Sequence, residues 1–134
     1  MKTKYLKLWS TFITQVAAMS NCQRLKVGAA LVSLDGERLL AYGYNGDWAG
    51  GPNTYTDEAP GDLRFVHAEM NCCARPRHHE PCAMFVSSTP CVTCATLIVN
   101  AKVSQVYALE KYRDESGWKL LKQALGEGNV VLLG

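Results

Sequence analysis

Two short motifs in this chain combine residues that could hold a metal ion and move a proton. The first is His67-Ala68-Glu69, and the second is Pro90-Cys91-Val92-Thr93-Cys94. One imidazole and two thiolates match the usual three protein ligands of a catalytic zinc centre, whose fourth position is left to water. The motifs therefore predict a hydrolytic site with one Zn²⁺ per chain. Glu69 is left over as the catalytic acid and base, and the ligands are His67, Cys91 and Cys94.

Two structural interpretations compete with the catalytic one. Cys91 and Cys94 could form a redox pair, or they could belong to a closed structural zinc site with a fourth protein ligand. A thioredoxin-like pair gives no reason for an upstream H-x-E motif. None of the candidate fourth ligands falls at a second C-x-x-C or H-x-x-x-H spacing; these are Cys72, Cys73, His78, His79 and Cys82. We therefore favour the catalytic interpretation.

Composition favours one domain without a nucleic-acid partner. The chain has 134 residues, of which 48% are hydrophobic, and this is enough for a single domain over residues 1–134. A formal net charge of +2 provides no strong basic surface for a long polyanion, although a small phosphorylated ligand needs only one or two cations. Two of the six cysteines are assigned to the metal and two are adjacent, which fits a reducing cytoplasm better than a disulfide scaffold.

The N-terminal segment begins with lysines, as a signal peptide does, but polar residues interrupt its apolar stretch: Ser10, Thr11, Thr14 and Gln15. Its apolar residues recur at spacings of three and four, which predicts an amphipathic helix; these are Leu6, Trp9, Ile13, Val16 and Ala17. No apolar run approaches transmembrane length. We expect a soluble protein of the cytoplasm, or of the cytosol of an infected host cell, with no membrane partner.

Hydrophobic patterns and turn signals predict the element order α-β-β-α-β-α-β-α-β. After the first helix, strands over 27–34 and 38–44 flank an Asp35-Gly36 turn. Helices are expected over 65–75, 91–100 and 117–125, and strands over 83–87, 105–109 and 129–133. A helix between the last two strands permits a parallel crossover. The sequence thus predicts an α/β fold in which helices cover both faces of a sheet.

Both motifs fall at expected helix starts, where free main-chain amides and the helix dipole stabilise thiolates. Residues 45–63 form a long segment rich in Gly, Pro, Asn and Asp. Loops of this length in a compact domain are usually functional or disordered, so we expect this one to contact a ligand.

The residues as a whole resemble the cytidine deaminase superfamily, and within it the deoxycytidylate (dCMP) deaminases. H-x-E followed by P-C-x-x-C is the order found in zinc-dependent nucleobase deaminases, where the glutamate is not a ligand. The similarity extends over most of the chain, through Cys22-x-Arg24-x-x-Val27-Gly28-Ala29, Gly43-Tyr44-Asn45-Gly46, Pro52, His67-Ala68-Glu69-Met70-Asn71, Thr89-Pro90-Cys91-x-x-Cys94-Ala95 and Lys111-Tyr112-Arg113-Asp114.

The resemblance implies a cytidine deaminase-like three-layer α/β/α fold. Its mixed five-stranded sheet would have the order 2-1-3-4-5 with the last two strands parallel. The resemblance also implies a homo-oligomer, commonly a hexamer. The implied activity is the hydrolysis of dCMP to dUMP and ammonia, which supplies dUMP for dTMP synthesis.

Substrate contacts are carried over by position. The resemblance implies Asn45 as a partner of a sugar hydroxyl, Ala68 as a main-chain contact, and Val27 and Ala29 as neighbours of the base. Arg24 and Lys26 are the candidates for the 5′-phosphate, because arginine can hold phosphate through two hydrogen bonds. A surface or interface ion pair is the alternative for Arg24. Tyr112 is expected near the ligand, with half-buried packing as its alternative.

Regulation is also implied, with dCTP as activator and dTTP as inhibitor at a second site that includes Gly43, Tyr44, Asn45 and Gly46. Glycines would allow main chain to approach phosphates closely, and the following loop could reorganise. Asp47 or Glu58 could help hold Mg²⁺ on a triphosphate. The alternative is that Gly43 and Gly46 simply end a strand.

Several related functions remain open. A dCTP deaminase, or an enzyme acting on both nucleotides, would use a similar pocket. A tRNA adenosine deaminase would be expected to carry Glu rather than Thr89 before Pro90 and to have a basic surface. Guanine and riboflavin-pathway deaminases share the zinc chemistry. A silent nucleotide-binding or structural zinc module would leave Glu69 unexplained. Some relatives hold a second, structural zinc, for which the candidates here are Cys22, His78, His79 and Cys82.

Overall fold

The computed structural model describes residues 1–22, 24–52, 65–75 and 80–134. Five strands form one sheet in the order β2-β1-β3-β4-β5. Their bounds are β1 Gly28–Ser33, β2 Leu39–Tyr44, β3 Cys82–Ser88, β4 Val103–Glu110 and β5 Val130–Leu132. β1 is antiparallel to β2 and β3, whereas β3, β4 and β5 run parallel. The predicted strand order and the parallel arrangement of the last two strands are both confirmed.

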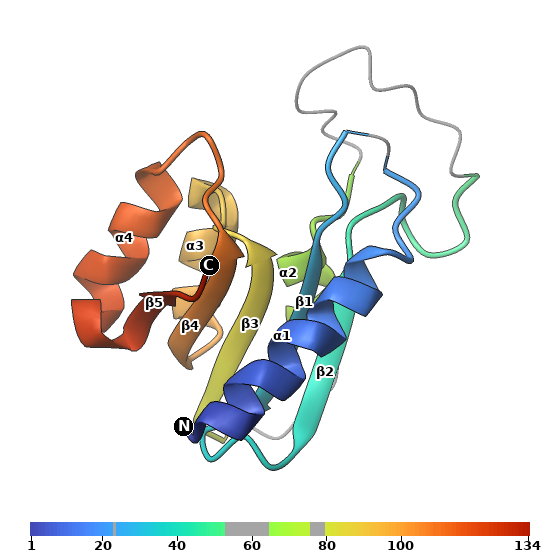
Figure 1. The fold of residues 1–134 in the computed structure, drawn as a ribbon. Coiled ribbons are helices and arrows are strands. Elements are labelled where there is room, and N and C mark those ends of the chain that lie inside the picture. The colour runs from blue at the N-terminus through green and yellow to red at the C-terminus, as the bar shows by residue number, and fades with distance from the viewer. Residues whose placement is uncertain (23, 53–64, 76–79) are drawn as a thin grey trace.

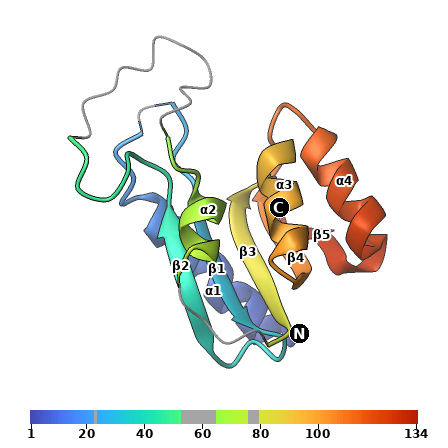
Figure 2. The same cartoon turned by 180° about the vertical axis from the view of Figure 1, so that it is seen from behind.

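Helices cover both faces of this sheet (Figures 1 and 2). Helix α1 (Thr3–Ala17) packs on one face, where Trp9 and Ile13 join a core with Val32 and Phe85. The helices α2 (Ala68–Cys73), α3 (Val92–Asn100) and α4 (Ser116–Leu125) lie on the other face, and a short 3₁₀ helix, η1 (Glu127–Asn129), precedes β5. The predicted three-layer α/β/α architecture is therefore confirmed.

The central strands are buried along their whole length. Ala29 and Leu31 of β1 join the core beneath α2 and α3, and Ala30 and Val32 join the core beneath α1. Successive side chains of a strand point to opposite faces, so a strand covered on both faces needs apolar residues at every position. This explains why the sequence shows a continuous run here and no alternation. At the end of β1 the expected turn is present, with Gly36 at φ 83°.

The bounds of one predicted helix were clearly wrong, whereas the ends of the other elements with predicted bounds differ by at most two residues. The helix expected over 65–75 occupies only Ala68–Cys73, because Phe65, Val66 and His67 are not helical. Val66 instead pairs with Gly46 in an isolated antiparallel bridge through two hydrogen bonds of 2.8 and 3.1 Å. A bond to a residue so distant in the sequence gives no local signal. Its effect is to place His67 at the N-cap position of α2, in an extended conformation.

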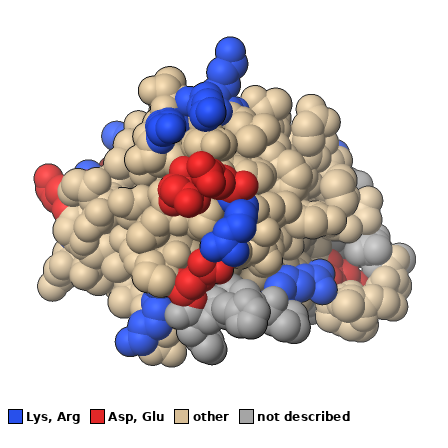
Figure 3. Space-filling view, turned by 90° about the horizontal axis from the view of Figure 1, so that it is seen from below, with Lys and Arg blue, Asp and Glu red and all other residues tan. Residues whose placement is uncertain are grey.

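Charged side chains are mixed on the surface. On the face shown in Figure 3, groups of Lys and Arg lie between groups of Asp and Glu. An ion pair of 2.7 Å joins Arg38 and Glu80. A mixed face of this kind lacks the continuous basic stripe typical of a nucleic-acid-binding surface. In the described part of the chain, none of the helices is long and apolar enough to cross a membrane.

Candidate active site

A cavity of about 170 Å³ opens at the edge of the sheet where β1 begins and β2, β3 and β4 end. The strand register brings these ends together, since Gly28 pairs with Tyr44 and Ser88 pairs with Glu110. Segments adjoining the four strand ends, together with the start of α2, supply the wall. The lining residues are Cys22, Arg24, Leu25, Val27, Asn45, Phe65, His67, Ala68, Glu69, Ser88, Thr89, Cys91 and Tyr112.

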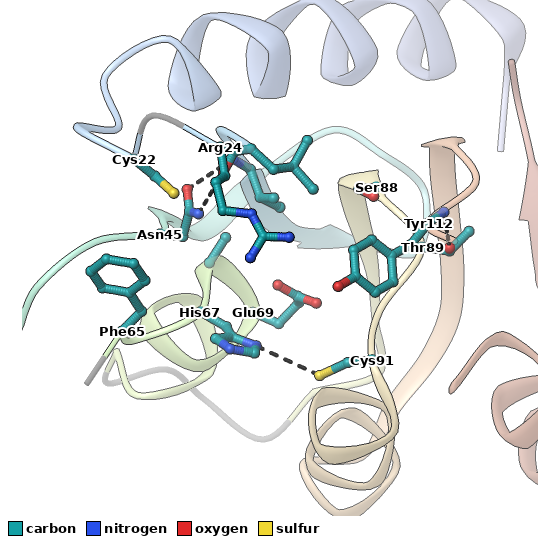
Figure 4. A pocket seen from close by; sticks show the side chains of 13 residues that line it. Cys22, Arg24, Asn45, Phe65, His67, Glu69, Ser88, Thr89, Cys91 and Tyr112 are labelled. Carbon is teal, nitrogen blue, oxygen red and sulfur yellow. Dashed lines mark hydrogen bonds between the residues drawn. The ribbon is translucent and has the colours of Figure 1, made fainter. Parts of the chain in front are cut away.

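The three predicted metal ligands converge at this cavity (Figure 4). His67 is the N-cap residue of α2, Cys91 is the N-cap residue of α3, and Cys94 lies in the first turn of α3. The Nδ1 atom of His67 is 3.2 Å from the Sγ of Cys94 and 3.6 Å from the Sγ of Cys91. Tetrahedral zinc with ordinary Zn–N and Zn–S bonds separates such donors by about 3.5 Å. The donor set therefore fits a zinc ion.

The closeness of these three groups shifts their pKa values in different directions. Hydrogen bonds from Cys94 and His67 lower the pKa of Cys91 to about 4. The hydrogen bond to Cys91 and burial raise the pKa of Cys94, so that thiol keeps its proton in the absence of a metal ion. The hydrogen bond to Cys91 raises the pKa of His67. A metal ion bound by both sulfurs displaces the remaining proton, because a coordinating thiol is deprotonated.

Glu69 lies in the first turn of α2 and is only 5% exposed. Its carboxyl group points into the cavity and is not part of the ligand cluster (Figure 4). Burial raises the pKa of Glu69, which the nearby His67 partly counteracts. A carboxyl group whose pKa moves towards neutral can take up and release a proton at working pH. The geometry therefore separates a ligand set from a proton carrier, as the two motifs predict.

The structure places most of the predicted substrate residues around this cavity. Five of them line it: Arg24, Val27, Asn45, Ala68 and Tyr112. Lys26 is exposed and is not among the lining residues, and Ala29 is fully buried in the core beneath α2 and α3. The roles of the five lining residues stay predictions at this point.

Asn45 also has a structural task. Its Oδ1 accepts a hydrogen bond from the main-chain N–H of Val27, and its Nδ2 donates to the carbonyl oxygen of Leu25, both at 2.8 Å. The buried hydroxyl of Ser20 donates to the Asn45 carbonyl oxygen at 2.7 Å. These bonds hold the segment that carries Arg24 against the end of β2. The Asn45 side chain keeps one N–H and one lone pair for a ligand.

Five lining residues had no predicted contact with the substrate: Cys22, Leu25, Phe65, Ser88 and Thr89. Phe65, Ser88 and Thr89 each stand within three residues of a metal ligand. Cys22 and Leu25 lie beside Arg24. A search of the residues flanking the motifs would have found them, but the sequence alone does not reveal which neighbours face the cavity.

A second groove, of about 690 Å³, runs along β2 and the segment after it. The predicted regulatory residues Gly43, Tyr44, Asn45 and Gly46 all line it, together with Asp47. Asn45 lines both the groove and the cavity, so it belongs to their common wall. Of the loop predicted over 45–63, residues 53–63 lie outside the described residues, and the candidate Mg²⁺ ligand Glu58 is among them.

The candidate ligands for a second zinc do not form a cluster among the described residues. Within the described ranges, His67, Cys91 and Cys94 form the only cluster of three or more potential metal ligands. Cys22 lies in the catalytic cavity, and Cys82 is buried at the start of β3. His78 and His79 lie outside the described residues. One zinc per chain stays a prediction.

Helix α4 supports the ligand turn by direct contact with its main chain. Gly117 lies in the first turn of α4, and a Cβ built there would overlap the carbonyl oxygen of Pro90 and lie 2.6 Å from the carbonyl carbon of Cys91. No side chain fits between the helix and this turn. The absence of a side chain at Gly117 therefore allows α4 to press against the segment that presents Cys91.

Replacing Gly117 with alanine should lower both stability and zinc affinity. The methyl group must push either α4 or the Cys91 turn away, and forced overpacking typically costs about 1–3 kcal/mol. We expect a lower free energy of unfolding in denaturant titrations and a larger zinc dissociation constant in competition with a chelator. Gly128→Ala is the matched control, because a Cβ there meets no described atom within 4 Å. Equal zinc affinity in the two variants would contradict this role.

Comparisons with known proteins agree with this geometry. The family described as "Cytidine and deoxycytidylate deaminase zinc-binding region" matches residues 3–110, from α1 to the end of β4. The chain belongs to this deaminase family. Membership, together with the donor set, identifies the centre as a zinc site.

Named relatives of this deaminase-family chain include the deoxycytidylate deaminase of Saccharomyces cerevisiae, 30% identical over 92% of the chain and 44% of the relative. ComE operon protein 2 of Bacillus subtilis is 35% identical over 73% of the chain and 55% of that protein. The chain thus spans about half the length of these curated relatives. A crystal structure of the dCMP deaminase from cyanophage S-TIM5, in complex with dCMP and dUMP, aligns with a TM-score of 0.85 and 27% identity over 97% of both chains.

Proposed function

We propose that this protein is a zinc-dependent hydrolase that converts dCMP to dUMP and ammonia and so supplies dUMP for dTMP synthesis. The observation that carries the proposal is the buried, unligated carboxyl group of Glu69, which points into the cavity that His67 and Cys91 line. A structural zinc module has no use for such a group. Membership in the deaminase family and the likeness to a phage enzyme bound to dCMP and dUMP support the substrate class.

His67, Cys91 and Cys94 would hold a zinc ion, which would supply Lewis-acid activation of a water molecule at neutral pH. Glu69 accepts a proton from the attacking water and delivers it to ring nitrogen 3 of the cytosine as the water oxygen adds to carbon 4. Glu69 then takes the proton of the new hydroxyl group on carbon 4 and passes it to the amino group on the same carbon; the carbon–nitrogen bond breaks, ammonia leaves, and the oxygen becomes the carbonyl of dUMP. Burial supports both transfers, because it raises the pKa of Glu69 and brings its two protonation states closer in energy near neutral pH.

The proposed contacts to the nucleotide follow from the cavity wall. Arg24 is the only Lys or Arg among the described lining residues, and its guanidinium group points into the cavity (Figure 4). We assign it to the 5′-phosphate, which it can hold through two hydrogen bonds. The remaining hydrogen-bond capacity of Asn45 suits a sugar hydroxyl, and Val27, Ala68 and Tyr112 would surround the base. One cation at the wall favours a monophosphate over a triphosphate.

The decisive assay follows ammonia release from dCMP, dCTP, deoxycytidine and an adenosine-containing RNA. We expect the largest kcat/KM with dCMP. A larger kcat/KM with dCTP would reassign the protein as a dCTP deaminase. Reaction with the RNA alone would overturn the substrate class.

Regulation by dCTP as activator and dTTP as inhibitor is part of the proposal. The second groove has room for a nucleotide, and Asp47 could help hold Mg²⁺ on its phosphates. Tyr44 and Asn45 connect this groove to the catalytic cavity. The carbonyl oxygen of Tyr44 accepts a 2.8 Å hydrogen bond from Nδ2 of Asn71, which stands two residues after Glu69 on α2.

Glycines 43 and 46 differ in a way that permits a clean test. A Cβ at Gly43 would lie 2.7 Å from the Cβ of Asn71, so packing against α2 already requires that glycine. A Cβ at Gly46 meets no described atom within 4 Å, and Gly46 has no positive φ. Nothing in the described part of the chain requires glycine at position 46, and close approach of a ligand is the reason that we propose for it.

Replacing Gly46 with alanine should weaken the response to dCTP and dTTP by about 5-fold in half-maximal concentration, because the methyl group intrudes on the groove. The free energy of unfolding should change by less than about 0.5 kcal/mol. Activity at a fixed dCMP concentration, titrated with each triphosphate, measures the shift. Gly128→Ala is again the control. An unregulated wild-type enzyme, or a fully regulated Gly46→Ala variant, would remove the regulatory site.

We also propose that the protein forms a homo-oligomer of six subunits, the arrangement that the family resemblance implies. Strand β2 lies at the edge of the sheet, and large apolar side chains are exposed on and just after it, with Leu39 39%, Tyr42 44% and Trp48 52% accessible. Unpaired edges and apolar patches are typical of subunit contacts. Light scattering would measure the mass in solution, and a monomer at micromolar concentration would refute the assignment.

A further inference from the structure

Thr89 joins two parts of the cavity wall that are distant in the sequence. It follows β3 and precedes Pro90, and it is only 4% exposed. Its main-chain N–H donates to the carbonyl oxygen of Glu110 at 2.9 Å. Its Oγ1 accepts a 2.7 Å hydrogen bond from the main-chain N–H of Tyr112. One buried residue therefore ties the turn that leads to Cys91 to the segment that follows β4.

That segment depends on this tie. Residues 111–115 belong to no helix or strand. Within the described residues, the other interactions of this segment are made inside it or with α4. The guanidinium group of Arg113 lies 5.7 Å from the centre of the Tyr112 ring, Lys111 pairs with Glu115 at 3.7 Å, and a carboxylate oxygen of Asp114 accepts a hydrogen bond from the main-chain N–H of Ser116. Across the described residues, no other hydrogen bond is recorded from the main chain of Tyr112 to the sheet or to the ligand turn.

The hydroxyl group of Thr89 therefore largely sets the position of the Tyr112 ring, because it holds the main chain of Tyr112 in place. In Figure 4 the ring lies on the opposite side of the cavity from Asn45 and Phe65, and its hydroxyl group points towards Glu69. We propose that Thr89 is a positioning residue for the deamination reaction, whose hydroxyl holds the main chain of Tyr112 so that the ring closes the substrate cavity. This inference rests on the proposed function of the same cavity.

Removing the hydroxyl should act on substrate binding before it acts on the metal. Without Oγ1, the N–H of Tyr112 loses its partner, and the segment must move to find water, because an unpaired buried N–H is costly. The main-chain bond from Thr89 to Glu110 does not depend on the side chain, so the Cys91 turn keeps its own support. The ring shifts while the ligands stay in place.

The test compares Thr89→Val, which keeps the shape of the side chain without its hydroxyl, with Thr89→Ser, which keeps the hydroxyl. For Thr89→Val we expect KM for dCMP to rise about 10-fold with kcat within about twofold of wild type, the pattern of lost ground-state binding. Zinc content should be unchanged. Thr89→Ser should restore KM. The matched control is Thr96→Val, which removes an exposed hydroxyl that donates within its own helix at 2.8 Å.

A double-mutant cycle decides whether Thr89 acts through Tyr112. In a Tyr112→Ala background there is no ring left to position, so Thr89→Val should raise KM by less than about twofold. A full 10-fold rise in that background would mean that Thr89 contacts the substrate directly and would overturn the inference. A KM for dCMP that is the same in Thr89→Val as in wild type would also overturn the inference. So would loss of zinc with a parallel fall in kcat, since that marks mere support of the ligand turn.

Two controls keep the outcome clear. If Thr89→Val fails to fold by circular dichroism, Thr89→Ala takes its place as a smaller variant without a hydroxyl. The cycle is run with whichever compound of the substrate panel the wild-type enzyme turns over. Absence of dCMP turnover by wild type therefore counts against the proposed function alone, and unaltered KM in the hydroxyl-free variants counts against the role of Thr89 alone.

Discussion

Replacement of Glu69 by glutamine is expected to lower kcat for dCMP by at least about 10³-fold, within the range that general acid–base catalysis contributes. Glutamine keeps the size of the side chain and its hydrogen-bonding oxygen but cannot carry a proton between water, ring nitrogen and leaving ammonia. Because Glu69 is not among the ligands, zinc content should stay as in wild type. Single-turnover ammonia release and metal analysis of the same sample measure both quantities.

The same substitution should not lower stability. Burial raises the pKa of Glu69, so the folded state binds this proton more tightly than the unfolded state does. The contribution of Glu69 to stability is then present at acid pH and is lost as pH rises through its folded-state pKa. Above the folded-state pKa of Glu69, a neutral glutamine avoids that loss, and we expect the metal-free variant to have a melting temperature equal to or above that of metal-free wild type.

Glu80→Gln is the matched control for Glu69→Gln. Glu80 pairs on the surface with Arg38, whose side chain is 62% exposed, and exposed pairs contribute little to stability. This control should keep wild-type kcat. A zinc-loaded Glu69→Gln enzyme that deaminates dCMP at a rate near that of wild type would remove Glu69 from its role and with it the mechanism proposed above.

Replacement of Cys94 by alanine should abolish zinc binding and activity together. Only His67 and Cys91 remain as donors. A catalytic zinc ion usually needs three protein ligands, which leave the fourth tetrahedral position to water. We expect about one zinc per chain in wild type and less than about 0.2 in Cys94→Ala after dialysis. Because binding to the folded state adds stability, chelation should lower the melting temperature of wild type but not that of the variant.

Cys82→Ala provides the comparison for Cys94→Ala. It also removes a buried sulfur, at the start of β3, but Cys82 is outside the ligand cluster, so one zinc per chain should remain. Two zinc ions per wild-type chain, with one lost in Cys82→Ala, would demonstrate a second site and refute the prediction of one. Retention of a full zinc equivalent by Cys94→Ala would refute the ligand assignment.

Local sequence patterns were sufficient to predict the metal centre. His67 and Glu69, the two ends of the H-x-E motif, both lie at the start of α2. Cys91 and Cys94 lie one helical turn apart at the start of α3. Each pair is therefore positioned by the start of a single short helix. The strand order followed from the family resemblance alone, whereas the parallel ending also followed from the helix expected between the last two strands. Chirality and connection rules leave few arrangements for such an order.

The wall of the substrate cavity could not be predicted in this way. Arg24 and Lys26 looked equivalent as phosphate ligands, but only Arg24 lines the cavity. Their segment is neither helix nor strand, so it has no period from which the direction of a side chain could be inferred. The helix start at Ala68 was missed for a related reason, because Val66 is held by a bridge to Gly46.

The chemistry of this protein could be predicted from its sequence, because a metal ligand set and a proton carrier need particular residue types at short, fixed spacings. The shape of the site was decided by tertiary structure. Hydrogen bonds between residues 18 and 23 positions apart, Asn45 with Val27 and Thr89 with Tyr112, hold the wall together. Such bonds form only after the sheet has brought the ends of four strands to one edge, and no local pattern records which partners then meet.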